Sequence, residues 1–212
     1  DIARSYAFYA DRPGKPEIPL AWWVRPYPGN YGDWLSPLIV DHYSGAKISL
    51  QLLTQPARRQ HMISVGSVGR FIKSNSVVFG TGISTEDLEL NTRAKYVSVR
   101  GPITAKLVKD SGGPIVQSMG DPAILMARVM PMTRGATNGR VALIRHFTHR
   151  ALPLRKPEFM DELEVLMSHP NSIRQLVEKL HQYDYVVTSA MHILITCQSY
   201  GIPCALVSFE GY

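Results

Sequence analysis

One stretch near the C-terminal end of the sequence constrains the fold more than any other. Residues 185–188 form a β-branched and aromatic run of strand length. Residues 191–199 follow as a helix, which Gly201 ends and Pro203 keeps from continuing. Residues 204–209 form a second apolar run. A strand, a helix and a strand joined by short turns predict two parallel strands with a right-handed crossover.

A histidine follows the first of these strands at a position where ligands commonly bind. Ser189 is a good N-cap, and it places His192 in the first turn of the helix. In open α/β sheets, ligands bind at the carboxyl ends of the strands, and the free N–H groups of a helix N-terminus attract anions. His192 is therefore expected beside a bound phosphate or carboxylate. The alternative is a partly buried helix histidine without chemistry.

Strand and helix patterns alternate over most of the chain. Residues 1–19 are expected to be an irregular lead-in because they are rich in Pro, Arg and Lys. The further expected strands lie at 20–24, 61–67, 77–79, 96–100, 115–117 and 141–144. Glycines follow several of these strands, and the alternation predicts an α/β fold with mainly parallel sheets.

The sequence also predicts a division into two domains. Residues 130–139 are rich in Pro, Gly, Thr and Asn and are expected to link a first domain, 1–135, to a second domain, 140–212. The second domain shows only about three strands, few for a doubly wound sheet. We therefore expect this domain to be incomplete.

The composition limits the partners. The net charge of +6 over 212 residues favours an anionic partner, but the charge is spread without a basic run, so no nucleic acid is expected. The seven histidines show no metal-ligand spacing, and no apolar segment is long enough to span a membrane. Cys197 and Cys204 lie in apolar surroundings and are expected to be reduced core residues of a cytoplasmic protein.

Seven short motifs, taken in order, resemble those of the polysaccharide pyruvyl transferase family. The best match is Thr-Ser-Ala-Met-His at 188–192, followed by Gly-Ile-Pro at 201–203. The others are Asn-Tyr-Gly-Asp at 30–33, Gly-Ser-Val-Gly at 66–69, Gly-Thr-Gly at 80–82, Val-Arg-Gly-Pro at 99–102, Gly-Asp-Pro at 120–122 and Ile-Arg-His at 144–146.

The resemblance implies a glycosyltransferase-B-like (GT-B-like) fold, in which two Rossmann-like domains face a cleft. It implies a first domain on the acceptor side and a second on the donor side. The implied activity transfers pyruvate from phosphoenolpyruvate, the donor substrate, to two hydroxyls of one sugar. The product is a cyclic ketal, phosphate is released, and no cofactor is needed. The implied acceptor is a saccharide of an exopolysaccharide or of its lipid-linked precursor, in the cytoplasm or at the inner face of the membrane.

The resemblance also assigns roles to residues. His192 matches the motif histidine and is expected to be the general acid, a role that suits an imidazole near neutral pH. Asp33 is expected to bind acceptor hydroxyls or to act as the base, with helix capping as the alternative. His149 is expected either to face the same site as Arg145 and His146 or to be a solvated loop histidine, and the second is favoured. The expected substrate-binding residues are Arg145, His146, Ser189, Met191, Arg100 and Asn30.

Two positions depart from the family pattern. Many members have Arg where this chain has Ala190, and Pro where it has Arg145. Arg145 is therefore expected to bind the carboxylate or phosphate of the donor, as its planar fork suits such groups. Two alternatives stay open. One is a nucleotide-sugar glycosyltransferase of the same fold class, and the other is a non-catalytic glycan- or nucleotide-binding protein.

Overall fold

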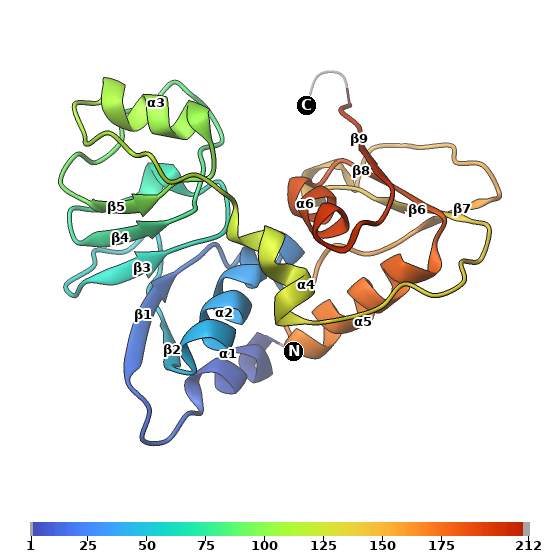
Figure 1. Cartoon of the computed structure of the whole chain (residues 1–212), viewed down its shortest axis with the longest axis horizontal. Helices are drawn as coiled ribbons and strands as arrows, with labels where there is room; N and C mark the ends of the chain where they lie inside the picture. Colours follow the sequence, from blue (N-terminus) through green and yellow to red (C-terminus); the bar gives the residue numbers. More distant parts are fainter. Residues whose placement is uncertain (1, 210–212) are drawn as a thin grey trace. The chain divides into compact units, whose positions relative to one another are not determined.

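The structure, a computed structural model, describes residues 2–209 and divides them into two compact units, each with its own parallel sheet (Figure 1). The N-terminal unit contains Ala3–Val24 and Asp33–Pro122. The C-terminal unit contains Ile2, Arg25–Gly32 and the chain from Ala123 onward. These bounds differ from the predicted division near 135, because the loop before Asp33 and the chain after Pro122 make their contacts within the C-terminal unit.

Five parallel strands form the sheet of the N-terminal unit, in the order β2–β1–β3–β4–β5. Parallel neighbours require crossover connections, and α2 provides the one between β1 and β2. The strands are β1 Glu17–Ala21, β2 Lys47–Leu50, β3 His61–Ile63, β4 Ser76–Phe79 and β5 Lys95–Ser98. The helices are α1 Ile2–Ala10, α2 Tyr31–Ser44, α3 Pro102–Asp110 and the short 3₁₀ helix Gly69–Phe71.

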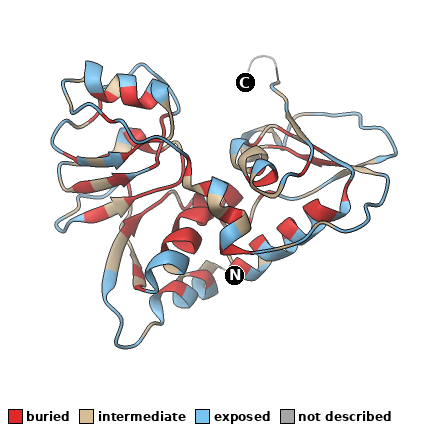
Figure 2. Cartoon of the chain, in the orientation of Figure 1, coloured by how far each residue is buried: buried red, intermediate tan, exposed pale blue. Residues whose placement is uncertain are grey.

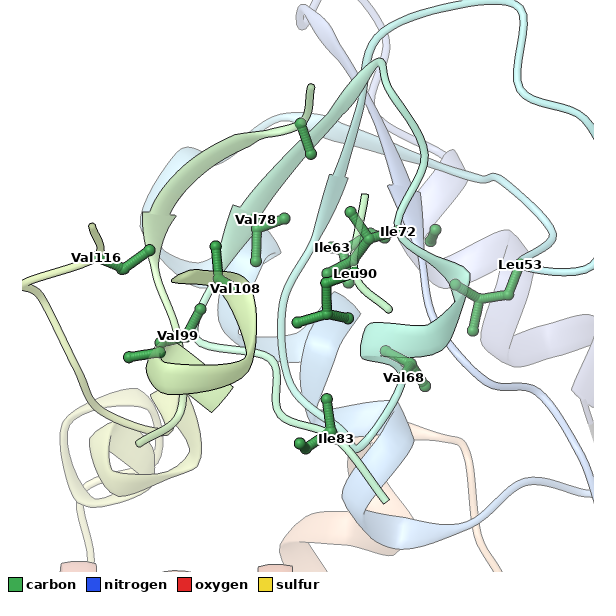
Figure 3. Packing of buried hydrophobic residues seen from close by; sticks show 13 residues of the cluster. Leu53, Ile63, Val68, Ile72, Val78, Ile83, Leu90, Val99, Val108 and Val116 are labelled. Carbon is green, nitrogen blue, oxygen red and sulfur yellow. The ribbon is translucent and has the colours of Figure 1, made fainter. Parts of the chain in front are cut away.

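One buried hydrophobic cluster of the N-terminal unit joins strands of the sheet to α3 (Figure 3). Ala21, Ile63 and Val78 are register partners on neighbouring strands and therefore face the same way. Val108 of α3 belongs to the same buried cluster, and each such side chain contributes roughly 1.5–3 kcal/mol when fully buried. This packing fixes the carboxyl ends of the strands, from which the glycine-rich loops emerge.

Four parallel strands form the sheet of the C-terminal unit, in the order β7–β6–β8–β9. They are β6 Val141–Ile144, β7 Met160–Glu162, β8 Tyr185–Thr188 and β9 Cys204–Leu206. The helices are α4 Met126–Val129, α5 Pro170–Gln182, α6 Met191–Tyr200 and the 3₁₀ helices Pro122–Leu125 and Phe147–His149. The mixed α/β class and the mainly parallel sheets predicted from the sequence are confirmed.

Helices α5 and α6 flank β8 in sequence, and both follow clear local patterns in the sequence. The buried residues of α5 recur at helical spacing, and the alternation of buried and exposed positions is visible in Figure 2. Gly201 ends α6 in the left-handed conformation, with φ of 66°, and the N–H of Ile202 then donates to the carbonyl of Cys197 at 2.8 Å. The predicted end of this helix at Gly201 is confirmed.

The structure corrects several predicted elements. The first strand runs over Glu17–Ala21 rather than 20–24, because its pairing with β3 ends at Ala21. Residues 115–117 form no strand, and the nearest pairing is one bridge between Val99 and Met119. Helix α1 and strands β2 and β7 were not predicted: α1 lies in the expected irregular lead-in, and β2 and β7 are short edge strands. β7 reads Met-Asp-Glu, which carries no strand pattern.

Candidate active site

The site is built at the carboxyl ends of two central strands of the C-terminal unit. β6 and β8 are parallel neighbours, and their last residues, Ile144 and Thr188, are register partners. The residues that follow them, Arg145–His146 and Ser189–His192, therefore leave the sheet side by side.

Hydrogen bonds tie these two loops together. The Thr188 hydroxyl donates to the carbonyl of Ile144 at 2.7 Å and accepts from the N–H of Ala190 at 2.9 Å. The N–H of His146 donates to the Ser189 hydroxyl at 2.9 Å. The prediction that Ser189 caps α6 is wrong, because its hydroxyl is used in this link and Ala190 is the N-cap residue. Ser189 positions the loop after β6 instead.

The Ser189 hydroxyl also connects two histidines. It lies 2.9 Å from Nδ1 of His149 while it accepts from the backbone of His146. The hydroxyl proton is then available to Nδ1 of His149, which would place the ring proton on Nε2. The rings of His146 and His149 have their centroids 5.7 Å apart. The prediction that His149 is a solvated loop histidine is wrong, since it is half-buried and bonded to Ser189.

The environment of His146 keeps its imidazole neutral. Burial lowers the pKa of His146 to about 4, and electrostatic interactions with His149 and His192 lower it further. Its Nδ1 lies 2.7 Å from the Thr148 hydroxyl and accepts from the N–H of Thr148 at 3.4 Å. With Nδ1 in use as an acceptor, the neutral ring carries its proton on Nε2 and can donate it to a ligand.

His192 stands in the first turn of α6 and is half-buried. Its ring packs against Gly32, where an added Cβ would lie only 2.6 Å from Cγ and 2.9 Å from Cβ of His192. The Thr196 hydroxyl donates to the carbonyl of His192 at 2.7 Å and lies 2.8 Å from the hydroxyl of Tyr31. The first turn of α2 thus holds the first turn of α6, and Gly32 is required for the close approach.

The loop before α2 is anchored to the same unit. Asn30 is buried and forms an antiparallel bridge with Leu166, and the N–H of Tyr31 donates to the carbonyl of Val165 at 2.9 Å. Met191, at the start of α6, is exposed. Asn30 is therefore placed to hold the loop, whereas Met191 offers an accessible apolar side chain beside His192.

Arg145 is 9 % exposed and is largely engaged within the protein. Its Nε donates to Glu162 at 2.7 Å, and Nη1 donates to the carbonyls of His149 and Leu152 at 2.8 and 2.7 Å. Arg145 thus fixes the turn that carries His149. The expected contact with the donor could use only the second terminal nitrogen, Nη2, and stays a prediction.

Two predicted residues lie in the N-terminal unit. Asp33 is 8 % exposed in the first turn of α2, and its Oδ1 lies 3.2 Å from the point where a Cβ on Gly66 would stand. The alternative that Asp33 caps this helix is wrong, because α2 begins at Tyr31. A carboxylate in a first turn is still favoured by the helix dipole. Asp33 therefore faces the glycine-rich loop after β3.

Arg100 follows β5 and is held from several sides. Nη1 donates to the Ser67 hydroxyl at 2.8 Å, and Nη2 donates to the carbonyl of Ile83 at 3.0 Å. The guanidinium lies so close to Gly82 that an added Cβ would overlap it. Burial lowers the pKa of Arg100, and the charge of Asp121 opposes this shift. Arg100 thus links the loops after β3 and β4, which carry the Gly-Ser-Val-Gly and Gly-Thr-Gly motifs.

Comparison with known proteins decides the family. A sequence profile of the family described as polysaccharide pyruvyl transferase matches residues 16–210. The chain belongs to the polysaccharide pyruvyl transferase family. The resemblance inferred from the short motifs is therefore confirmed.

Two further proteins are similar to this pyruvyl transferase family member, one in sequence and one in fold. The chain is 23% identical over 199 residues to an uncharacterized protein of Acanthamoeba polyphaga mimivirus, covering 92% of this chain and 69% of that protein. The structure resembles a crystal structure of a protein of uncharacterized function from Klebsiella pneumoniae, with a TM-score of 0.56 and 14% identity, over 100% of this chain and 88% of that one. At this identity the structural match shows the fold alone.

In this family member, the local sequence patterns do not indicate the residues that pack α2 against α6. Gly32 was noted only as part of a motif, and neither Tyr31 nor Thr196 was singled out. The motif spacing gave no sign that the start of α2 meets α6. Among residues 2–209, no cluster of His, Cys, Asp or Glu is arranged to hold a metal ion, and no helix is long and apolar enough to cross a membrane.

Proposed function

We propose that this polysaccharide pyruvyl transferase family member transfers pyruvate from phosphoenolpyruvate to two hydroxyls of one sugar. A proton adds to the methylene carbon of the donor, and one sugar hydroxyl adds to its central carbon and loses its proton. The bond to phosphate breaks, phosphate leaves, and the second hydroxyl closes the cyclic ketal as its proton is lost. The chemistry needs a general acid, a site for two anionic groups and a base.

The observation that carries the proposal is the place of His192 in the first turn of α6. The N–H groups in the first turn of a helix point toward its N-terminal end and favour an anion there. A bound dianion favours the imidazolium form of a neighbouring histidine, which can then deliver a proton near neutral pH. The ring is held in place by Gly32, so its position does not depend on the substrate. His192 is the proposed acid.

The neighbouring residues have supporting roles in this proposal. His146 is neutral near pH 7 and offers an N–H to the phosphate or carboxylate without carrying charge. Ser189 and Arg145 hold the loop that bears His146 and His149. Met191 is proposed to contact the sugar or the methylene group. These roles fit the hydrogen bonds described above, and each one can be tested by a single substitution.

The sugar acceptor is proposed to bind mainly to residues of the N-terminal unit. Asp33, fixed in the first turn of α2, is proposed to accept protons from the sugar hydroxyls or to bind them. Arg100 and Asn30 are proposed to shape the acceptor loops. The GT-B-like cleft, an exopolysaccharide or lipid-linked acceptor and a cytoplasmic location follow from the family resemblance and stay predictions.

The direct experiment incubates the purified protein with phosphoenolpyruvate and a panel of saccharides, and measures free phosphate. In deuterated water the product should carry deuterium in the ketal methyl group, because the added proton comes from solvent through the acid. Phosphate release that depends on a saccharide, with this label, supports the proposal. Release of nucleoside diphosphate from a nucleotide sugar would instead indicate a glycosyltransferase, and binding without turnover would indicate a non-catalytic protein.

A further inference from the structure

A cavity lies at the carboxyl edge of the C-terminal sheet, between the ends of β6 and β7. It has a volume of about 590 Å³, within the usual range for small-ligand sites. Its lining residues come from the loop after β6 and from the chain after β7. They are Arg145, Arg150, Ala151, Glu162, Leu163 and Glu164.

The charged residues of this cavity form two opposite pairs. Arg145 Nε and Glu162 lie 2.7 Å apart, and Arg150 and Glu164 also lie 2.7 Å apart. Two guanidinium groups and two carboxylates give the walls no net charge. An anion such as phosphoenolpyruvate would meet as much repulsion as attraction here. The cavity therefore suits a neutral ligand with many polar groups.

Two of these polar groups, Glu164 and Arg145, are held by backbone atoms as well as by an ion-pair partner. Glu164 accepts from the N–H groups of Val165 and Leu166 at 2.8 and 2.9 Å, in addition to its contact with Arg150. Arg145 is held through Nε and Nη1, and among residues 2–209 its Nη2 makes no hydrogen bond. The cavity thus presents held carboxylate oxygens as acceptors and one held guanidinium nitrogen as a donor.

We propose that this cavity is a subsite for a neutral sugar unit. A sugar hydroxyl donates to a carboxylate and accepts from a guanidinium, so it can use both kinds of group at once. Leu163 and Ala151 offer apolar surface to the C–H groups of the ring. Arg145 connects the cavity to the histidines through the carbonyl of His149. The sugar in this cavity is a unit of the acceptor saccharide other than the one proposed to meet Asp33, and this role rests on the proposed function.

The test measures sugar binding without donor, so that it does not depend on turnover. Saturation-transfer NMR is recorded with D-glucose, D-galactose, D-mannose and N-acetyl-D-glucosamine, and phosphorus NMR with inorganic phosphate. Ala151→Trp fills the cavity from an exposed position and leaves both ion pairs intact. Ala136→Trp, at an exposed position lining another hollow of the same unit, is the matched control.

The expected result is binding of at least one neutral sugar. Ala151→Trp should weaken this binding at least about tenfold, a loss of about 1.4 kcal/mol. Ala136→Trp should leave it unchanged. The proposal is overturned if none of the four sugars binds, or if Ala151→Trp binds them as well as the unaltered protein does. It is also overturned if inorganic phosphate binds instead and this binding is lost in Ala151→Trp. Sugar binding that persists without any turnover of phosphoenolpyruvate would reject the proposed reaction and leave the subsite standing.

Discussion

The imidazole of His192 occupies the space that a side chain on Gly32 would need. This relationship joins the first turn of α2 to the first turn of α6, two segments far apart in the sequence but within the same compact unit. The contact with His192 explains why residue 32 is a glycine. Its backbone conformation does not require one, because Gly32 is not among the glycines with a positive φ angle. The backbone of Gly32 thus limits the position of the His192 ring, the proposed acid.

Gly32→Ala should displace the His192 ring while the backbone keeps its conformation. We expect turnover to fall roughly 10–100-fold from misplacement of the acid, and stability to fall by about 1–3 kcal/mol from overpacking. The measurements are phosphate release and urea denaturation. Gly135→Ala is the control, because an added Cβ there meets nothing within 4 Å. Equal turnover in Gly32→Ala and Gly135→Ala would show that the contact with Gly32 does not position His192.

Arg145→Lys should destabilise the C-terminal unit. Lysine keeps the charge but cannot reach Glu162 and the carbonyls of His149 and Leu152 at once. We expect a loss of about 1–3 kcal/mol in the free energy of unfolding, the range for hydrogen bonds to charged groups. Arg150→Lys is the control, since its exposed pair with Glu164 contributes about 0–1 kcal/mol. Similar small losses in both variants would contradict the role of Arg145 in holding the turn.

His146 should make stability depend on pH. Its pKa is about 4 in the folded chain and ordinarily 6.5, so between these values the unfolded chain binds a proton that the folded chain excludes. The free energy of unfolding should therefore decrease as the pH falls from 6.5 towards 4. His149 and His192 face His146 and repel its charged form.

His146→Asn removes this titration and keeps an acceptor for the N–H of Thr148. Urea midpoints are measured at about pH 7 and about pH 5, on either side of the ordinary pKa of histidine. The variant should lose less stability than the unaltered protein between the two conditions. An identical loss would mean that other groups cause the acid sensitivity.

Thr196→Val should leave the buried hydroxyl of Tyr31 without the partner that it has now. Tyr31 is fully buried, and burial raises its pKa above the ordinary range. We expect a loss of about 1–3 kcal/mol for Thr196→Val and a smaller loss of about 0.5–1.5 kcal/mol for Tyr31→Phe, which leaves Thr196 bonded to the carbonyl of His192. The double variant should cost less than the sum. Strict additivity would show that the two hydroxyls are not coupled.

The sequence predicted those features that depend on local patterns. The β8–α6–β9 unit follows from a β-branched run, a helix of suitable length and Gly201 at its end, all within residues 185–206. The place of His192 follows from the same pattern. The α/β class follows from the alternation of strands and helices. None of these features needs knowledge of which segments meet in space.

Other features depend on tertiary contacts and could not be predicted from local patterns. Ser189 has the chemistry of an N-cap, but the neighbouring strand brings the N–H of His146 to its hydroxyl, and the cap position moves to Ala190. Arg145 has the chemistry of an anion ligand, but Glu162 of the unpredicted strand β7 lies beside it. In both cases the neighbour comes from β6 or β7, a segment distant in the sequence, so the local pattern does not indicate it.

The central claim is that His192 delivers the proton to phosphoenolpyruvate, and one substitution tests it most directly. His192→Gln keeps the size and polarity of the side chain but cannot transfer a proton near neutral pH. Phosphate release is measured with the saccharide found to be an acceptor, and donor affinity is measured in parallel. We predict a fall in turnover of at least about 100-fold, within the roughly 10²–10⁴-fold range for loss of a general acid, with donor affinity within about tenfold. Near-normal turnover in a folded His192→Gln protein would contradict the claim.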